Sequence, residues 1–82
     1  MFYAYVLQSQ RSGRYYIGST GDVDGRLAQH NAGMTRSTRH SRPWELVHFE
    51  AHATLSEARV RERLIKSWKN PAYMCRQLGI DG

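Results

Sequence analysis

The hydrophobic positions near the N-terminus follow the period of a β-strand. Aromatic and branched residues alternate over 2–7, and a similar run over 14–19 follows a polar loop at 8–13. A third run over 44–50 comes directly after Pro43. These patterns predict three strands, of which the first two form a hairpin.

Three further segments carry the capping signals of helices: 22–32, 54–69 and 70–78. Thr54 and Glu57 form a capping box at the start of the long helix. The apolar side of this helix is expected to contain Leu55, Ala58, Leu64, Ile65 and Trp68. The resulting order, β-β-α-β-α-α, predicts an α+β fold: a small three-stranded antiparallel sheet with helices packed on it, as one domain over 1–82.

The hairpin predicts a pair of neighbouring tyrosines. If Leu7 lies opposite Arg14, then Tyr5 lies opposite Tyr16, and directly opposed residues point to the same face of a sheet. Either these rings only fill that face, or they supply hydroxyls to a site. A phenol has a pKa of about 10, so it acts as a base only where a cation or metal stabilises the phenolate.

Composition narrows the choice of partner. The 82 residues hold 12 Lys and Arg against 7 Asp and Glu, a net charge of +5 with neutral histidines. This excess favours an anionic partner, and nucleic acid is the first candidate. No segment approaches the roughly 20 apolar residues of a membrane helix, so we expect a cytoplasmic protein with no membrane partner. The single Cys75 is expected to be a small buried hydrophobic residue.

Three side chains are candidates for phosphate chemistry. Arg26 and His30 are four residues apart and share a helix face, where they either face solvent or bind one phosphate. Glu62 is the one acid in 59–76, among six cations. It is either a salt-bridge partner or the carboxylate of a Mg²⁺ site, because Mg²⁺ keeps most of its waters and needs only one or two carboxylates.

Exposed cations form a predicted phosphate-binding surface. The loop over 34–43 is basic and contains no acid, and the long helix has a basic side. The residues expected to contact DNA are Arg14, Arg36, Arg39, Arg42, Arg59, Arg63 and Lys66.

In this order, the motifs resemble the GIY-YIG nuclease superfamily, in particular its small stand-alone bacterial members and the N-terminal nuclease domain of the bacterial excision-repair endonuclease. Tyr3-Ala4-Tyr5 corresponds to the first triplet with only its final Tyr retained, and Tyr16-Ile17-Gly18 is the intact second triplet. Arg26 stands at the catalytic arginine, within a "RLAQHN" segment similar to that of the small members. The segment "SEARVRERLIKSWK" resembles the final helix, with Glu62 at the metal-binding glutamate.

This resemblance implies a DNA endonuclease that uses one divalent metal, Mg²⁺ or Mn²⁺, in repair, recombination or DNA uptake. Tyr5 or Tyr16 would activate water, Arg26 would stabilise the transition state, His30 would assist, and Glu62 would bind the metal. Between the two tyrosines, Tyr5 is the preferred base. The alternatives are a catalytically inactive nucleic-acid-binding module on the same fold, and a protein-interaction or membrane-surface domain. Single-stranded or structured DNA is the expected substrate, because a small platform with a basic loop and exposed aromatic residues can hold a single strand by stacking and phosphate contacts.

Overall fold

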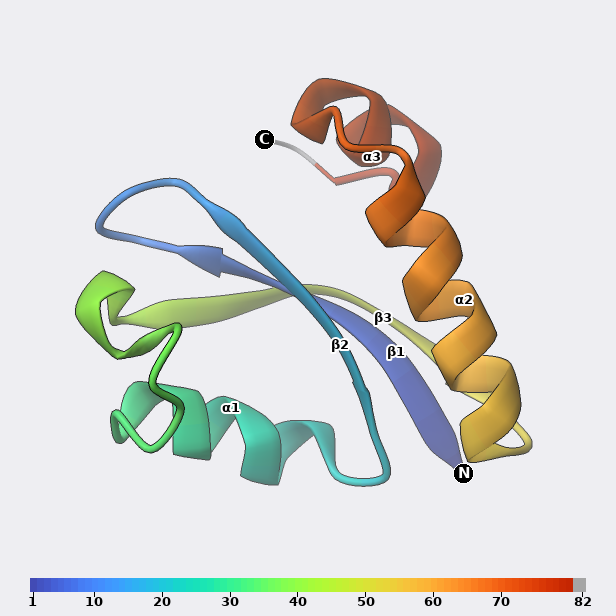
Figure 1. The fold of residues 1–82 in the computed structure, drawn as a ribbon, viewed down its shortest axis with the longest axis horizontal. Helices are drawn as coiled ribbons and strands as arrows, with labels where there is room; N and C mark the ends of the chain where they lie inside the picture. The colour runs from blue at the N-terminus through green and yellow to red at the C-terminus, as the bar shows by residue number, and fades with distance from the viewer. Residues whose placement is uncertain (81–82) are drawn as a thin grey trace.

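The computed structural model describes residues 1–80 and shows three strands and three α-helices in the predicted order (Figure 1). The strands are β1 (Phe2–Ser9), β2 (Tyr15–Thr20) and β3 (Trp44–His52). The helices are α1 (Val23–Asn31), α2 (Leu55–Ser67) and α3 (Pro71–Leu78). A short 3₁₀ helix, η1 (Arg39–Ser41), lies in the basic loop and was not predicted. The α+β fold class is confirmed.

The sheet is antiparallel with the order β2-β1-β3, so β1 is central and β2 is an edge strand. Helix α1 covers one face, while α2 and α3 cover the other (Figure 1). Because both faces are covered, Ala4–Leu7 is buried at every position rather than at alternate ones. The two halves of the core centre on Tyr5, Leu7 and Trp44 on the α1 face, and on Val6, Ile65 and Met74 on the other.

The hairpin register differs from the predicted one by two residues. Tyr5 lies opposite Gly18, and Leu7 lies opposite Tyr16. The cause is Ser9, a buried residue whose hydroxyl accepts from two backbone N–H groups of the turn and donates to a carbonyl of the basic loop. These bonds extend β1 to Ser9 and shorten the turn. A shift of two residues preserves the face of every side chain, so Tyr5 and Tyr16 remain on one face.

Helix α2 starts as its capping box predicts, since the Thr54 hydroxyl accepts from Glu57 N–H. An ion pair then fixes α2 against the sheet. The Glu50 carboxylate on β3 accepts from Nε and Nη2 of Arg61, at 2.7 and 3.1 Å. This two-point contact sets the orientation of the face of α2 that carries Glu62.

Two predictions about burial were wrong. Leu64 is 46% exposed, because it lies on the outer side of α2 rather than on the side that packs against the sheet. Cys75 is only half-buried, and its thiol donates to the Tyr15 hydroxyl at 3.3 Å. Within residues 1–80, no helix is long and apolar enough to cross a membrane.

Candidate active site

The candidate site lies where β1, β2 and α1 meet. Tyr5 is 1% exposed, and its ring crosses over Gly18 on β2. A methyl group on Gly18 would lie 2.5 Å from the Tyr5 hydroxyl, so this position accommodates only glycine while Tyr5 keeps its place. The Tyr16 ring lies beside Tyr5, with 6.4 Å between ring centroids. The structure therefore brings the two phenols together, although not as directly opposed residues.

His30 is fully buried, and its hydrogen bonds define its tautomer. The Thr38 hydroxyl donates to the Thr35 carbonyl at 3.3 Å, so its oxygen is left to accept from His30 Nδ1–H at 2.8 Å. Nε2 of His30 is then an acceptor that faces the Tyr5 hydroxyl at 3.5 Å. The network assigns the Nδ1–H tautomer and makes His30 a proton acceptor for Tyr5.

Electrostatics keep both groups neutral in the resting site. Burial lowers the pKa of His30, and the nearby Arg26 guanidinium lowers it further. Burial raises the pKa of Tyr5, and the adjacent Arg26 only partly opposes this effect. A neutral imidazole and a neutral phenol therefore stand beside a fixed positive charge, which is a suitable arrangement for an anionic ligand.

Arg26 is half-buried on α1, one turn before His30. Its guanidinium donates to the Gln29 side-chain carbonyl at 2.9 Å and lies beside the Tyr5 hydroxyl. The Arg26 side chain is therefore held within the site and does not extend into solvent. A planar guanidinium in this position is suited to a phosphate oxygen.

Glu62 reaches the same region from α2, on the other face of β2. Its carboxylate accepts from the Ser19 hydroxyl at 2.6 Å and from the Lys66 ammonium at 2.6 Å. Burial raises the pKa of Glu62, but the hydrogen bonds from Lys66 and Ser19 outweigh it and leave the pKa below the ordinary value. Glu62 is therefore an ionised carboxylate, and its negative charge contributes to the raised pKa of Tyr5.

The donor set around Glu62 is compatible with a hydrated magnesium ion. Within residues 1–80, no three His, Cys, Asp or Glu side chains form a group that could hold a metal. Mg²⁺ often binds through one or two carboxylates and keeps several waters. One ionised carboxylate with hard oxygen donors fits this requirement, and Lys66 is exposed enough to move away from it.

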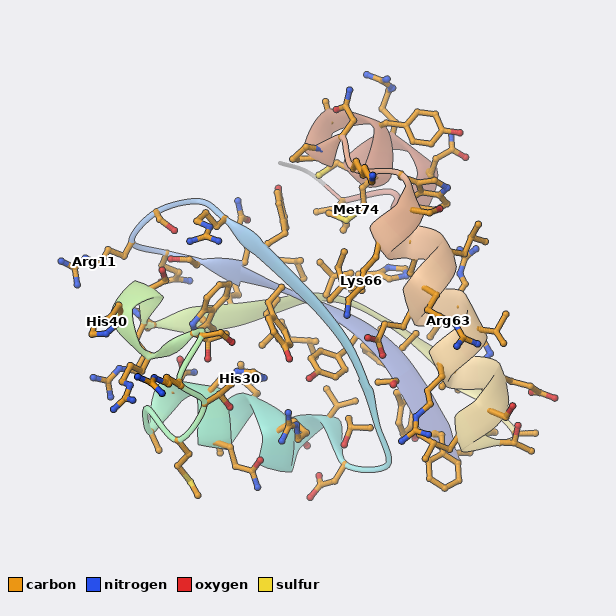
Figure 2. The ribbon with its side chains drawn as sticks, viewed as in Figure 1. Arg11, His30, His40, Arg63, Lys66 and Met74 are labelled. Atoms are coloured by element: carbon orange, nitrogen blue, oxygen red, sulfur yellow. The ribbon has the colours of Figure 1, made fainter. Side chains whose placement is uncertain are left out.

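The predicted DNA-contacting cations lie on both sides of this centre. Figure 2 shows Arg63 and Lys66 on α2 to one side of His30, with His40 of the basic loop on the other side. The seven cations are exposed: Arg14, Arg36, Arg39, Arg42, Arg59, Arg63 and Lys66. Arg42 also supports the loop, since its Nε donates to the Arg39 carbonyl at 2.8 Å.

Sequence reasoning missed the residues that hold the site in place. Thr38 positions His30, and the Trp44 indole N–H donates to the Thr38 carbonyl at 2.8 Å. The Asn31 side chain accepts from Trp44 N–H and donates to its carbonyl, which ties α1 to β3. Nothing in the local pattern singles out Thr38. Ser19 could have been found, because strand alternation places it on the face opposite Gly18.

The order of the elements and the motifs can be compared with known families. Residues 1–75 match the family model described as the GIY-YIG catalytic domain. The chain belongs to the GIY-YIG family.

Its relatives include proteins named UPF0213. A UPF0213 protein of Streptococcus pneumoniae is 43% identical over 70 residues, which cover 84% of this chain and 70% of the relative. A UPF0213 protein of Haloquadratum walsbyi is 42% identical over 67 residues, which cover 80% of this chain and 74% of the relative. A solution NMR structure of a UPF0213 protein from Bacillus halodurans is 35% identical, covers 82% of this chain and 72% of its own, and has a TM-score of 0.49.

Proposed function

We propose that the protein is a DNA endonuclease that hydrolyses phosphodiester bonds with the help of a divalent metal. The observation that carries this proposal is that two phenols, a buried neutral imidazole and a guanidinium lie together on one face of the sheet, while an ionised carboxylate lies across the edge strand β2 from them. Packing alone does not require this combination, whereas attack of water on a phosphodiester uses every member of it.

In the proposed reaction, a water molecule attacks phosphorus and the bond to the leaving oxygen breaks. The water proton passes to the Tyr5 oxygen while the Tyr5 proton passes to Nε2 of His30, 3.5 Å away. Arg26 stabilises the negative charge that grows on the phosphate oxygens. Tyr16 orients the water or the phosphate. The leaving oxygen takes a proton from solvent.

Glu62 is the proposed ligand of the divalent ion, Mg²⁺ or Mn²⁺. When bound, such an ion polarises the phosphate and neutralises charge on the leaving oxygen. Ser19 holds the carboxylate in place through its 2.6 Å hydrogen bond.

One contact favours the alternative, a DNA-binding module without activity. The Lys66 ammonium occupies one oxygen of Glu62 at 2.6 Å and supplies a positive charge at this point without any metal. A domain that only binds DNA would keep this pair closed in the presence of DNA and Mg²⁺.

A substrate panel distinguishes the two functions. Purified protein is incubated with single-stranded, duplex and branched DNA, with Mg²⁺ or with EDTA. We expect Mg²⁺-dependent cleavage by the wild type and none by Glu62→Gln. Glu57→Gln is the matched control, since it removes an exposed acid from the first turn of the same helix. Wild-type binding without cleavage would identify the inactive module.

A further inference from the structure

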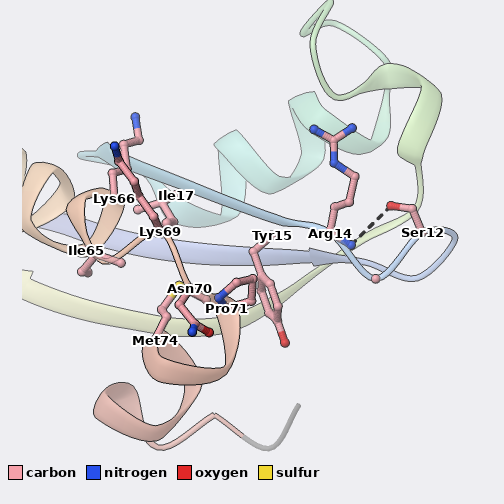
Figure 3. Close-up of a pocket in the computed structure, with 11 residues that line it drawn as sticks. Ser12, Arg14, Tyr15, Ile17, Ile65, Lys66, Lys69, Asn70, Pro71 and Met74 are labelled. Carbon is pink, nitrogen blue, oxygen red and sulfur yellow. Dashed lines mark hydrogen bonds between the residues drawn. The ribbon is translucent and has the colours of Figure 1, made fainter.

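A second concave surface lies beside the candidate site, on the face of β2 that α2 and α3 cover. It is a pocket of about 440 Å³ between the β1–β2 turn and the α2–α3 junction (Figure 3). This volume is within the range of about 300–1,000 Å³ that is usual for sites that bind small organic groups. None of the roles proposed above uses its interior.

The walls of this pocket combine apolar surface with positive charge. Tyr15, Ile17 and Met74 line its interior, as Figure 3 shows. Arg14, Lys66 and Lys69 also line it, and all three are exposed. No acidic residue occurs among the eleven lining residues, all of which belong to the described part of the chain. An apolar, partly aromatic interior surrounded by cations matches a flat uncharged ring attached to a phosphate chain.

The pocket is continuous with the candidate site through two elements. Tyr15 and Ile17 alternate along β2 with Tyr16 and Gly18, so successive residues of one strand serve the pocket and the site. Lys66 lines the pocket and also donates to Glu62. A nucleic-acid strand whose phosphate lies at the edge of β2 therefore has the pocket within reach of a neighbouring nucleotide.

We propose that this pocket binds one unpaired nucleobase of the DNA strand, next to the phosphate held at the candidate site. The base packs against the Tyr15 ring and the aliphatic surface, while Arg14 and Lys69 bind the flanking phosphates. This inference rests on the proposed function and adds a selection for unpaired strands. In duplex DNA the base would first have to leave its stack and its pair, which costs free energy that a single strand does not need.

Binding measurements in EDTA test this pocket separately from catalysis. The probes are a short fluorescent oligothymidylate and an abasic strand of equal length, which has the same phosphates and no bases. We expect the wild type to bind the thymidylate about 5- to 150-fold more tightly than the abasic strand, the effect of one stacked base. Tyr15→Leu should remove most of this ratio, whereas Tyr15→Phe, which keeps the ring, should preserve it.

The cations are tested by charge-matched variants. Arg14→Gln and Lys69→Gln should weaken the binding of both strands by a similar factor, because they act on phosphates. Arg76→Gln changes the net charge equally, does not line the pocket and should leave both affinities unchanged. A wild-type ratio near one, or an unchanged ratio in folded Tyr15→Leu, would overturn the proposal.

A measurement on the wild type keeps the test valid if Tyr15→Leu does not fold. Met74 is buried in the wall of the pocket, so a base stacked there should shift its methyl NMR signal. We expect a shift with the thymidylate and none with the abasic strand or a blunt duplex. Cleavage of DNA without any base-dependent shift would retain the endonuclease and reject the pocket. A base-dependent shift in a protein that never cleaves DNA would reject the endonuclease and retain the pocket.

Discussion

Gly18 links two parts of the sequence that lie far apart along the chain. Tyr5 is on β1, yet its ring occupies the space that a side chain at position 18 of β2 would need. The glycine of the Tyr-Ile-Gly triplet is therefore required for steric reasons. Because it has no side chain, the Tyr5 ring can cross β2 and place its hydroxyl beside His30.

Gly18→Ala should displace the Tyr5 ring. We expect a loss of about 1–3 kcal/mol in the free energy of unfolding, as for other overpacked sites, together with a loss of cleavage activity. Thermal or urea unfolding measures the first effect. Gly21→Ala is the matched control, because its methyl group would meet only the Phe2 ring, at 3.4 Å. Equal stability of the two variants would contradict the proposed position of Tyr5.

The two phenols should contribute unequally to catalysis. Tyr5 faces the acceptor nitrogen of His30, so Tyr5→Phe should lower the single-turnover rate by about 10²–10⁴-fold, the range for loss of a general base. Tyr16→Phe should cost less, because an orienting hydroxyl remains replaceable by water. Both variants keep their rings and should melt close to the wild type. The reverse order of rates would assign the base to Tyr16.

At the scale of elements, the sequence reveals features that depend on neighbouring residues, but not features that depend on contacts between distant residues. The helix starts were predicted correctly because Asp22, Thr54 and Asn70 cap their own helices through bonds to nearby N–H groups. The register of the hairpin was predicted wrongly, because Ser9 is held by its hydrogen bond to the carbonyl of Ser41, which lies 32 residues away. The exposure of Leu64 depends in the same way on how α2 lies on the sheet.

The candidate site shows the same division. Tyr5, Tyr16, Arg26, His30 and Glu62 could be chosen by their motifs. The structure brings the first four together on one face of the sheet and places Glu62 across β2 from them. Thr38 could not be chosen in this way, because its role exists only when the basic loop folds over α1. His30, which Thr38 positions, could be predicted from its four-residue spacing to Arg26. The complete burial of His30 could not, because it depends on contacts with β1 and the basic loop.

The basic loop should hold the DNA backbone without reading its sequence. Its arginines are exposed, and replacement of Arg36, Arg39 and Arg42 by Ala should weaken binding by a similar factor for all sequences. The slope of log affinity against log salt should fall by about 2–3, one unit or slightly less for each phosphate contact. Titrations at several salt concentrations measure this slope. A loss confined to particular sequences, with an unchanged slope, would contradict backbone binding.

At the scale of the whole molecule, buried ionisable groups make stability depend on pH. An unfolded histidine has a pKa of about 6.5, and burial lowers the pKa of His30 in the folded state. Below about pH 6.5 the unfolded chain therefore binds more protons, and the free energy of unfolding falls as the pH falls. Well above this value His30 contributes no slope, because it is then neutral in both states. The lowered pKa values of Glu50 and Glu62 act only under more acidic conditions, below about pH 4.3.

This pH dependence can be assigned by substitution. Urea unfolding of His30→Gln between pH 5 and 7.5 should show a flatter profile than the wild type, even if its overall stability is lower. His40→Gln is the control, because His40 is exposed in the basic loop. A slope in the wild type that survives in His30→Gln would assign the titration to another group.

The position of β2 at the edge of the sheet also affects self-association. Among the described residues no strand pairs with its outer side, so part of its backbone is open to pairing with another chain. Proteins commonly cover or charge such an edge, and under the proposed function DNA binds beside it. Bound DNA would cover the edge and supply a layer of negative charge. The concentrated protein should therefore aggregate more slowly with a non-cleavable oligonucleotide in EDTA than without one.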